Sequence, residues 1–242
     1  MTSFSGAFLK HLAIVTMVID HIGVVLLPDW FILRVIGRLS FIIFCFLLAE
    51  GAVFTHSRTK YTIRLLLIAL VSIVPFSYAK YGEWFNFEDL NVFFVLASSV
   101  MMLSLFDLCK NKPFEYIYKL LIVILFGVVG YLVGFEYNLY GYALVACFYK
   151  FRGNKVAIWW GATVATLVAL PLFKIFVESS RPINAIVYSV LEAIGLISLL
   201  FIFAYNGERG KQLPKWFYYL FYPAHLGILI LLKYFLFVNL CP

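Results

Sequence analysis

The chain has 242 residues, of which 64% are hydrophobic and only 13% are charged. Soluble domains are about half apolar, so this composition excludes an ordinary soluble protein and predicts one that lies in a lipid bilayer. The formal net charge of +7 would suit a nucleic-acid partner, but the basic residues stand in short groups between apolar runs. Such groups are typical of the loops between membrane helices, so we expect no nucleic-acid partner.

Nine apolar segments follow one another along the chain, and most have the length of about 20 residues that a helix needs to cross the hydrocarbon core. We expect helices at 7–27, 34–53, 61–79, 90–108, 116–134, 137–149, 155–177, 184–205 and 216–238. The sixth is short and contains Gly141, so 116–149 forms either two crossing helices or a re-entrant hairpin. The sequence therefore predicts an all-α, polytopic transmembrane bundle of about nine helices (eight to ten) in a single domain over residues 1–242.

The lysines and arginines predict the orientation of these helices. Most of the 19 basic residues fall in every second loop, beginning at the amino-terminal side. The largest loop on the other side, 81–90, instead carries Glu83, Glu88 and Asp89. Because cytoplasmic loops are enriched in Lys and Arg, we expect a cytoplasmic amino terminus, an odd number of crossings and a carboxyl terminus outside.

The cysteines give no sign of a metal centre. The four of them lie in or beside apolar segments, at Cys45, Cys109, Cys147 and Cys241. None belongs to a CxxC motif or to the Cys/His spacing of metal ligands. We therefore expect neither a metal site nor a disulfide framework.

Ionisable residues at membrane depth are costly unless they are paired or hydrated, so each is a candidate functional residue. From the helical rise of about 1.5 Å per residue, we expect one polar group in the outer half of the membrane: Asp20, His21, Arg34, Arg38, Asn91 and Glu192. The inner half holds a second group: Glu50, Arg64, Asp107 and His225. Arg34 and Arg38 share one helix face at the depth of Asp20. We expect an Asp20–Arg38 ion pair beside a free His21 imidazole, which serves either the function or only the packing of two helices.

Lys10 and His21 lie on one stripe of the first helix. They are separated by eleven positions, close to three turns, which places them about 16 Å apart along the axis. A long thioester with an anionic head that enters from the cytoplasm would meet Lys10 first and His21 last. The loop 206–211 adds Arg209 and Lys211 beside two glycines, so it is either an anion-binding loop, with backbone N–H groups turned toward phosphates, or a plain basic turn.

Several short motifs resemble the TraX family, named for the protein that acetylates the amino terminus of F pilin. They are IDHIG at 19–23, RVIGRLSF at 34–41, FCFLLAEG at 44–51, NVFF at 91–94, YNGERG at 205–210 and FYPAHL at 221–226. The family is in turn similar to membrane acyltransferases of the acyltransferase-three type, whose first helix carries a basic residue, ten positions and a histidine. Lys10 and His21 match that spacing, and Tyr222 to His225 resembles the late motif of those enzymes.

The resemblance implies an acyltransferase of the bacterial inner membrane. It would move an acetyl group from cytoplasmic acetyl-CoA to an amine or hydroxyl of a pilin-like or other envelope acceptor. His21 would act as general base, because imidazole titrates near neutral pH. Asp20 and Arg38 would set the electrostatic field at the His21 ring. Arg34 with Arg38 would stabilise the oxyanion that forms on the thioester carbonyl. The remaining expected roles are the binding of the CoA phosphates by Lys10, Arg209 and Lys211, and the lining of the inner approach by His225 and Glu50.

Two other classes of protein remain open. A secondary transporter or channel would use the same intramembrane charges as a proton or anion path. A structural assembly factor would need no chemistry at all. The sequence shows no internal repeat, which disfavours a transporter.

Overall fold

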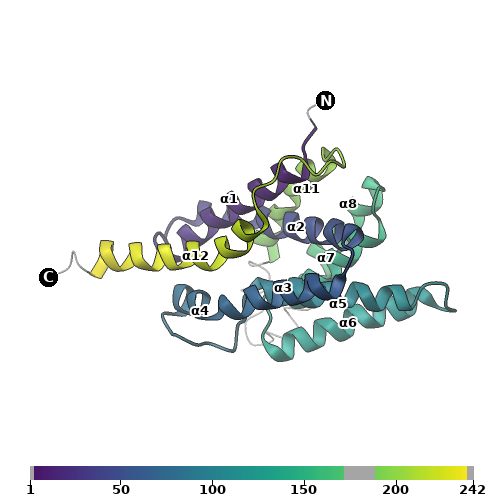
Figure 1. Ribbon diagram of the computed structural model, residues 1–242, viewed down its shortest axis with the longest axis horizontal. Helices are drawn as coiled ribbons and strands as arrows, with labels where there is room; N and C mark the ends of the chain where they lie inside the picture. Colours follow the sequence, from purple (N-terminus) through teal and green to yellow (C-terminus); the bar gives the residue numbers. More distant parts are fainter. Residues whose placement is uncertain (1–2, 172–188, 239–242) are drawn as a thin grey trace.

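The computed structural model describes residues 3–171 and 189–238, and its regular elements there are all helices, with two isolated β-bridges in addition (Figure 1). The elements are α1 (Gly6–Val25), α2 (Phe31–Phe54), α3 (Arg58–Val71), α4 (Ile73–Tyr81), α5 (Val92–Leu108), α6 (Glu115–Val133), α7 (Asn138–Lys150), α8 (Lys155–Val164) with the π-helical turn Ala165–Ala169, the 3₁₀ turn Gly195–Ile197, α11 (Ser198–Phe203), and α12 (Lys215–Lys233) with the π-helical turn Tyr234–Val238. Each of the nine expected segments contains a helix, and the all-α fold is confirmed. Residues 172–177 and 184–188 of the seventh and eighth segments lie outside the described residues.

Several of these helices suit a membrane. Within the described ranges, α1, α2, α6 and the stretch Lys215–Leu236 are each long and apolar enough to cross one, and α3 with α4 adds a fifth if the pair counts as one span. Val92–Leu108, Lys155–Ala169 and Ser189–Phe203 are shorter apolar helices. The chain is therefore a multi-pass helical membrane protein, and the full count of nine crossings stays a prediction.

The third expected helix is broken, contrary to the continuous segment 61–79. Its two parts, α3 and α4, meet at Ser72 at an angle of 45°. Pro75 lies in the first turn of α4 and lacks the N–H group that would continue the helical ladder of α3. The bend turns α4 and its last basic residue, Lys80, toward the loop before α5, where Lys80 contacts Asp89.

The α6–α7 region consists of two separate helices, of which α6 is long and apolar enough to cross a membrane by itself. Just before α5 and α7, Leu90 N donates to Gly134 O at 2.6 Å and Glu136 N donates to Leu90 O at 2.9 Å. At the opposite ends of the same two helices, the Tyr149 hydroxyl donates to Asp107 Oδ1 at 3.0 Å. Helix α7, with 13 residues, therefore lies beside α5 between the same two levels, and its crossing of the membrane stays a prediction. Figure 1 shows α6 along one edge of the bundle.

Candidate functional site

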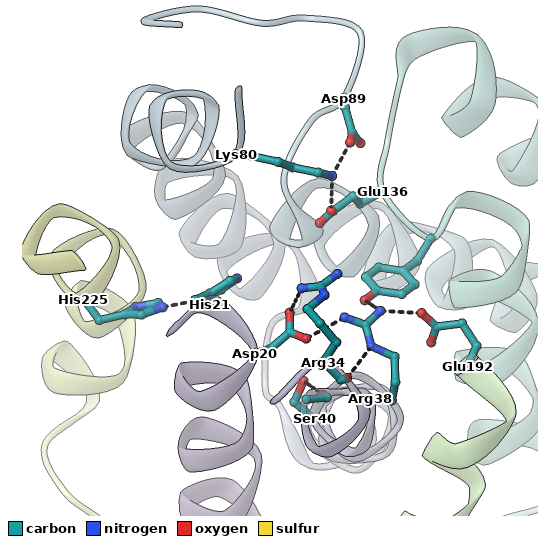
Figure 2. A network of polar contacts seen from close by, with 12 residues as sticks. Asp20, His21, Arg34, Arg38, Ser40, Lys80, Asp89, Glu136, Glu192 and His225 are labelled. Atoms are coloured by element: carbon teal, nitrogen blue, oxygen red, sulfur yellow. Dashed lines mark hydrogen bonds and ion pairs between the residues drawn. The ribbon is translucent and has the colours of Figure 1, made fainter. Parts of the chain in front are cut away.

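A charged cluster lies at the end of the bundle where α1 turns into α2. Asp20 of α1 accepts from both arginines of α2: Arg34 Nη1 lies 2.6 Å from Asp20 Oδ2, and Arg38 Nη2 lies 2.7 Å from Asp20 Oδ1. Arg38 Nη1 also lies 2.5 Å from Oε1 of Glu192, in the helical turn before Gly195 (Figure 2). The predicted Asp20–Arg38 pair is confirmed as part of a cluster of four charges. Two carboxylates balance two guanidiniums, which reduces the cost of burying them.

The backbone at Gly37 makes room for this cluster. A Cβ atom at position 37 would lie 2.2 Å from Asp20 Oδ1 and 2.3 Å from Asp20 Cβ. Only glycine therefore lets Asp20 rest directly on α2 between the two arginines. Gly37 was not among the predicted site residues, although its place between Arg34 and Arg38 in the RVIGR run was a usable signal.

His21 is not free, because its Nδ1 lies 2.7 Å from Nε2 of His225. The expectation that His225 belongs to the inner half is wrong. Residues 206–214 fold against the start of α1, and Lys10 Nζ donates to Gln212 Oε1 at 3.2 Å. Helix α12 therefore begins level with Lys10, one turn inside α1, and its eleventh residue, His225, reaches the level of His21. That register depends on tertiary packing, and hydropathy carries no signal for it.

A cavity of about 670 Å³ opens beside these groups. Its walls include the whole charged cluster with His21, together with the aromatic rings of Phe41, Phe44, Tyr137 and Tyr222. At another part of its wall, Lys80 contacts Asp89, and Lys80 Nζ lies 2.8 Å from Glu136 Oε1. From the sequence, Asp89 was assigned to the loop 81–90, and nothing in the spacing of Lys80, Asp89 and Glu136 predicts that they meet.

The two arginines differ in how many N–H donors remain without a partner. Arg38 donates four hydrogen bonds: besides those to Asp20 and Glu192, it donates to the Tyr137 hydroxyl and to the Arg34 carbonyl, each at 3.2 Å. One N–H group on Nη2 is left without a partner among the described residues. Arg34, in contrast, donates one side-chain hydrogen bond among the described residues, to Asp20. Its side chain is 29% exposed and lines the cavity. Arg34 is thus the arginine with more N–H groups left for a ligand and with the more exposed side chain.

The residues expected to meet acetyl-CoA are not at this cavity. Along α1 the lining begins only at Met17, and Lys10 instead lies 4.3 Å above the ring of Tyr218. Glu50 accepts from Arg152 at 2.6 and 3.2 Å, and this bond raises the pKa of the Arg152 guanidinium above its ordinary value. Neither Lys10 nor Glu50 is among the lining residues.

The loop that carries Arg209 and Lys211 caps α1. Gly6 N donates to Glu208 O at 2.8 Å, and Ala7 N donates to Arg209 O at 3.0 Å. These are N–H groups of the first helical turn, which have no partner within the helix. The loop therefore turns carbonyl groups toward α1, and the expectation that its N–H groups form an anion site there is not supported at these positions. Phosphate binding by the two side chains stays a prediction.

Metal ligation finds no support in the described part of the chain, where no three His, Cys, Asp or Glu side chains gather as ligands would. What the cavity offers is an imidazole, a guanidinium with spare donors and several aromatic rings in its wall. A base beside a cation inside a membrane is suited to proton transfer coupled to the stabilisation of a developing anion.

The fold and the cavity together define a multi-pass helical membrane protein with a charged site inside its bundle. The family described as TraX protein matches residues 5–233. The chain belongs to the TraX family, as its motifs predicted. The resemblance to acyltransferase-three enzymes stays a prediction.

Two curated proteins and the solved structures complete the comparison. The chain is 27% identical over 249 aligned positions to the probable fimbrial assembly protein FimC, serogroup H1, of Dichelobacter nodosus, covering 96% of this chain and 97% of the relative. It is 53% identical over 38 residues to an uncharacterized protein of Rickettsia prowazekii, covering 16% of this chain and 15% of that one. No solved structure matches the chain.

Proposed function

We propose that this protein is a membrane-embedded acetyltransferase that acts in pilus or fimbrial assembly at the bacterial inner membrane. It moves an acetyl group from acetyl-CoA to an amine or hydroxyl of a pilin-like acceptor. The family membership and the fimbrial relative support the assembly role. The observation that carries the chemistry is the placement of His21 and Arg34 on one cavity wall.

In this mechanism the acceptor gives its proton to His21 while its lone pair attacks the thioester carbonyl. The N–H groups that Arg34 has left stabilise the oxyanion that forms, and Asp20 holds Arg34 in place. The tetrahedral intermediate then collapses, the C–S bond breaks, and the CoA thiolate takes the proton from His21. Arg38 is only 7% exposed and donates to three neighbouring side chains and one backbone carbonyl, so it orders the cluster rather than touching the substrate.

Acetyl-CoA has to approach along α1 and α12. Between Lys10 and the cavity, the Tyr218 hydroxyl lies 3.1 Å from His11 Nε2, and Lys10 is bonded to Gln212. The first contact joins α1 to α12, and the second joins α1 to the residues just before α12, so the donor's arm enters only if these contacts open. In this proposal Lys10, Arg209 and Lys211 hold the CoA phosphates at the mouth.

The test is transfer from radiolabelled acetyl-CoA to a pilin amino-terminal peptide by purified protein in detergent. The wild type should give acetylated peptide, and His21→Gln should lower the rate by about 10²- to 10⁴-fold. His56→Gln is the matched control, since His56 is an exposed histidine outside both the cavity wall and the proposed donor path, and it should keep the wild-type rate. A wild type that gives no product in detergent but carries protons or anions in vesicles would replace this proposal with the transporter.

A further inference from the structure

We infer that His225 is a positioning residue that holds His21 in the tautomer whose Nε2 is free to accept a proton. The inference rests on the proposed role of His21 as the base. It assigns to the second histidine a task that neither the family nor the relatives supply. The argument follows one chain of hydrogen bonds, from the backbone of α12 to the cavity.

The chain begins at a carbonyl. His225 Nδ1 lies 2.9 Å from the Phe221 backbone oxygen, one turn earlier in α12. A carbonyl oxygen can only accept, so Nδ1 of His225 carries the hydrogen. A neutral imidazole has one donor and one acceptor nitrogen. Nε2 of His225 is therefore the acceptor.

The next link assigns the tautomer of His21. Its Nδ1 lies 2.7 Å from Nε2 of His225, so Nδ1 must be the donor and carries the hydrogen. The ring centroids are 4.9 Å apart with an angle of 26° between planes, which fits two rings joined edge to edge through their nitrogens. It follows that Nε2 of His21 holds a lone pair.

The Nε2 atom that carries this lone pair belongs to a residue of the cavity wall, where a general base has to accept a proton. Among the described residues no hydrogen-bond partner is found for His21 Nε2, and His21 lines the cavity. Figure 2 shows the second ring nitrogen of His21 on the side away from His225, toward Lys80 and Arg34. Without a partner at Nδ1, an imidazole in water or in a cavity exchanges between tautomers, and only one of them is competent here.

Neighbouring rings hold both imidazoles in place. Tyr222, whose side chain is buried, meets His21 edge-on at a centroid distance of 5.8 Å and His225 at 5.5 Å. Phe221 stacks on His225 at 5.2 Å. The late motif FYPAHL thus supplies the carbonyl, the two packing rings and the positioning histidine from consecutive turns of one helix.

The proton balance closes through the same chain. When Nε2 of His21 takes the acceptor's proton, its Nδ1 proton can pass to Nε2 of His225, which then donates at both nitrogens. When the CoA thiolate takes the proton from His21 Nε2, His225 returns its proton to His21 Nδ1. Both rings end in their starting tautomers.

The first test needs no activity. In protein labelled with ¹⁵N-histidine and reconstituted in bilayers, solid-state NMR distinguishes protonated from bare imidazole nitrogens, and His21→Gln identifies the His21 signals. In the wild type with neutral imidazole rings, His21 should be protonated at Nδ1 and bare at Nε2. A His21 that is protonated at Nε2, or mixed, would overturn the inference.

Two substitutions at position 225 separate its two hydrogen bonds. His225→Gln places an amide oxygen near the former Nε2, where it accepts from His21. His225→Asn places its amide near the former Nδ1, which keeps the bond to Phe221 and loses the one to His21. We expect His225→Asn to lower kcat by about 10²-fold or more with KM for acetyl-CoA unchanged, and His225→Gln to keep kcat within about tenfold.

The outcomes separate this inference from the proposed function. Equal kcat values for wild type and His225→Asn would remove His225 from the mechanism while leaving His21 as base. Equal losses in both variants, with the His21 tautomer unchanged, would reduce His225 to a packing residue and likewise overturn the inference. A wild type with the expected tautomer but no transfer would instead refute the acetyltransferase proposal.

Discussion

Removing Arg38 should leave Glu192, rather than Asp20, without a counter-charge. The exposed fractions of the Arg38 and Glu192 side chains are 7% and 9%. Asp20 keeps Arg34 after the loss of Arg38. Glu192 has no second ion pair among the described residues, and its Oε2 has no hydrogen-bond partner there. Breaking such a buried pair costs about 3–5 kcal/mol, and we expect Arg38→Met to lose that much free energy of unfolding.

The second substitution decides which carboxylate depends on Arg38. In the double variant with Glu192→Met, the Asp20–Arg34 pair remains and the cluster stays neutral, so the double variant should recover about 1–3 kcal/mol of the loss. The double variant with Asp20→Asn leaves Arg34 and Glu192 charged but without their partners. The double variant with Asp20→Asn should therefore recover less of the lost free energy of unfolding than the double variant with Glu192→Met.

The measurement is equilibrium unfolding by SDS in mixed micelles, followed by far-UV circular dichroism for each single and double variant. A coupling between Arg38 and Glu192 larger than that between Arg38 and Asp20 supports the assignment. If the losses of Arg38→Met and Glu192→Met simply add, within about 0.5 kcal/mol, the two residues are not energetic partners and the reasoning fails.

Two further predictions concern packing and topology. Gly37→Ala should lower both stability and transfer rate, because its methyl group would lie 2.2 Å from a carboxylate oxygen. Gly227→Ala, which meets nothing within 4 Å in α12, should instead be neutral or stabilise by about 1 kcal/mol; equal effects in the same unfolding assay would contradict the close approach. A reporter active only outside the cytoplasm should be silent at Gly207 and active after Pro242, and the reverse at Pro242 would mean an even number of crossings.

The class of fold and one pair in the site could be read from the sequence. A chain in lipid has to satisfy its backbone hydrogen bonds within each segment, so apolar length alone predicts helices, and the nine segments each contain one. Depth along a helix is equally local, since each residue adds about 1.5 Å. Asp20 and Arg38 were therefore placed at one level, and they meet there.

The sequence left open the relative register of the helices and which helices pack together. The level of His225 depends on where α12 begins, and that is set by the contact of Gln212 with Lys10 on another helix. The meeting of Lys80 with Glu136 depends on the bend at Ser72 and on the pairing of Leu90 with Gly134. Hydropathy and periodicity describe one helix at a time, whereas register and neighbours arise from packing between segments far apart in the chain. For that reason the sequence by itself determined the helices and the depth of their charges, and only the tertiary structure decided which imidazole faces which.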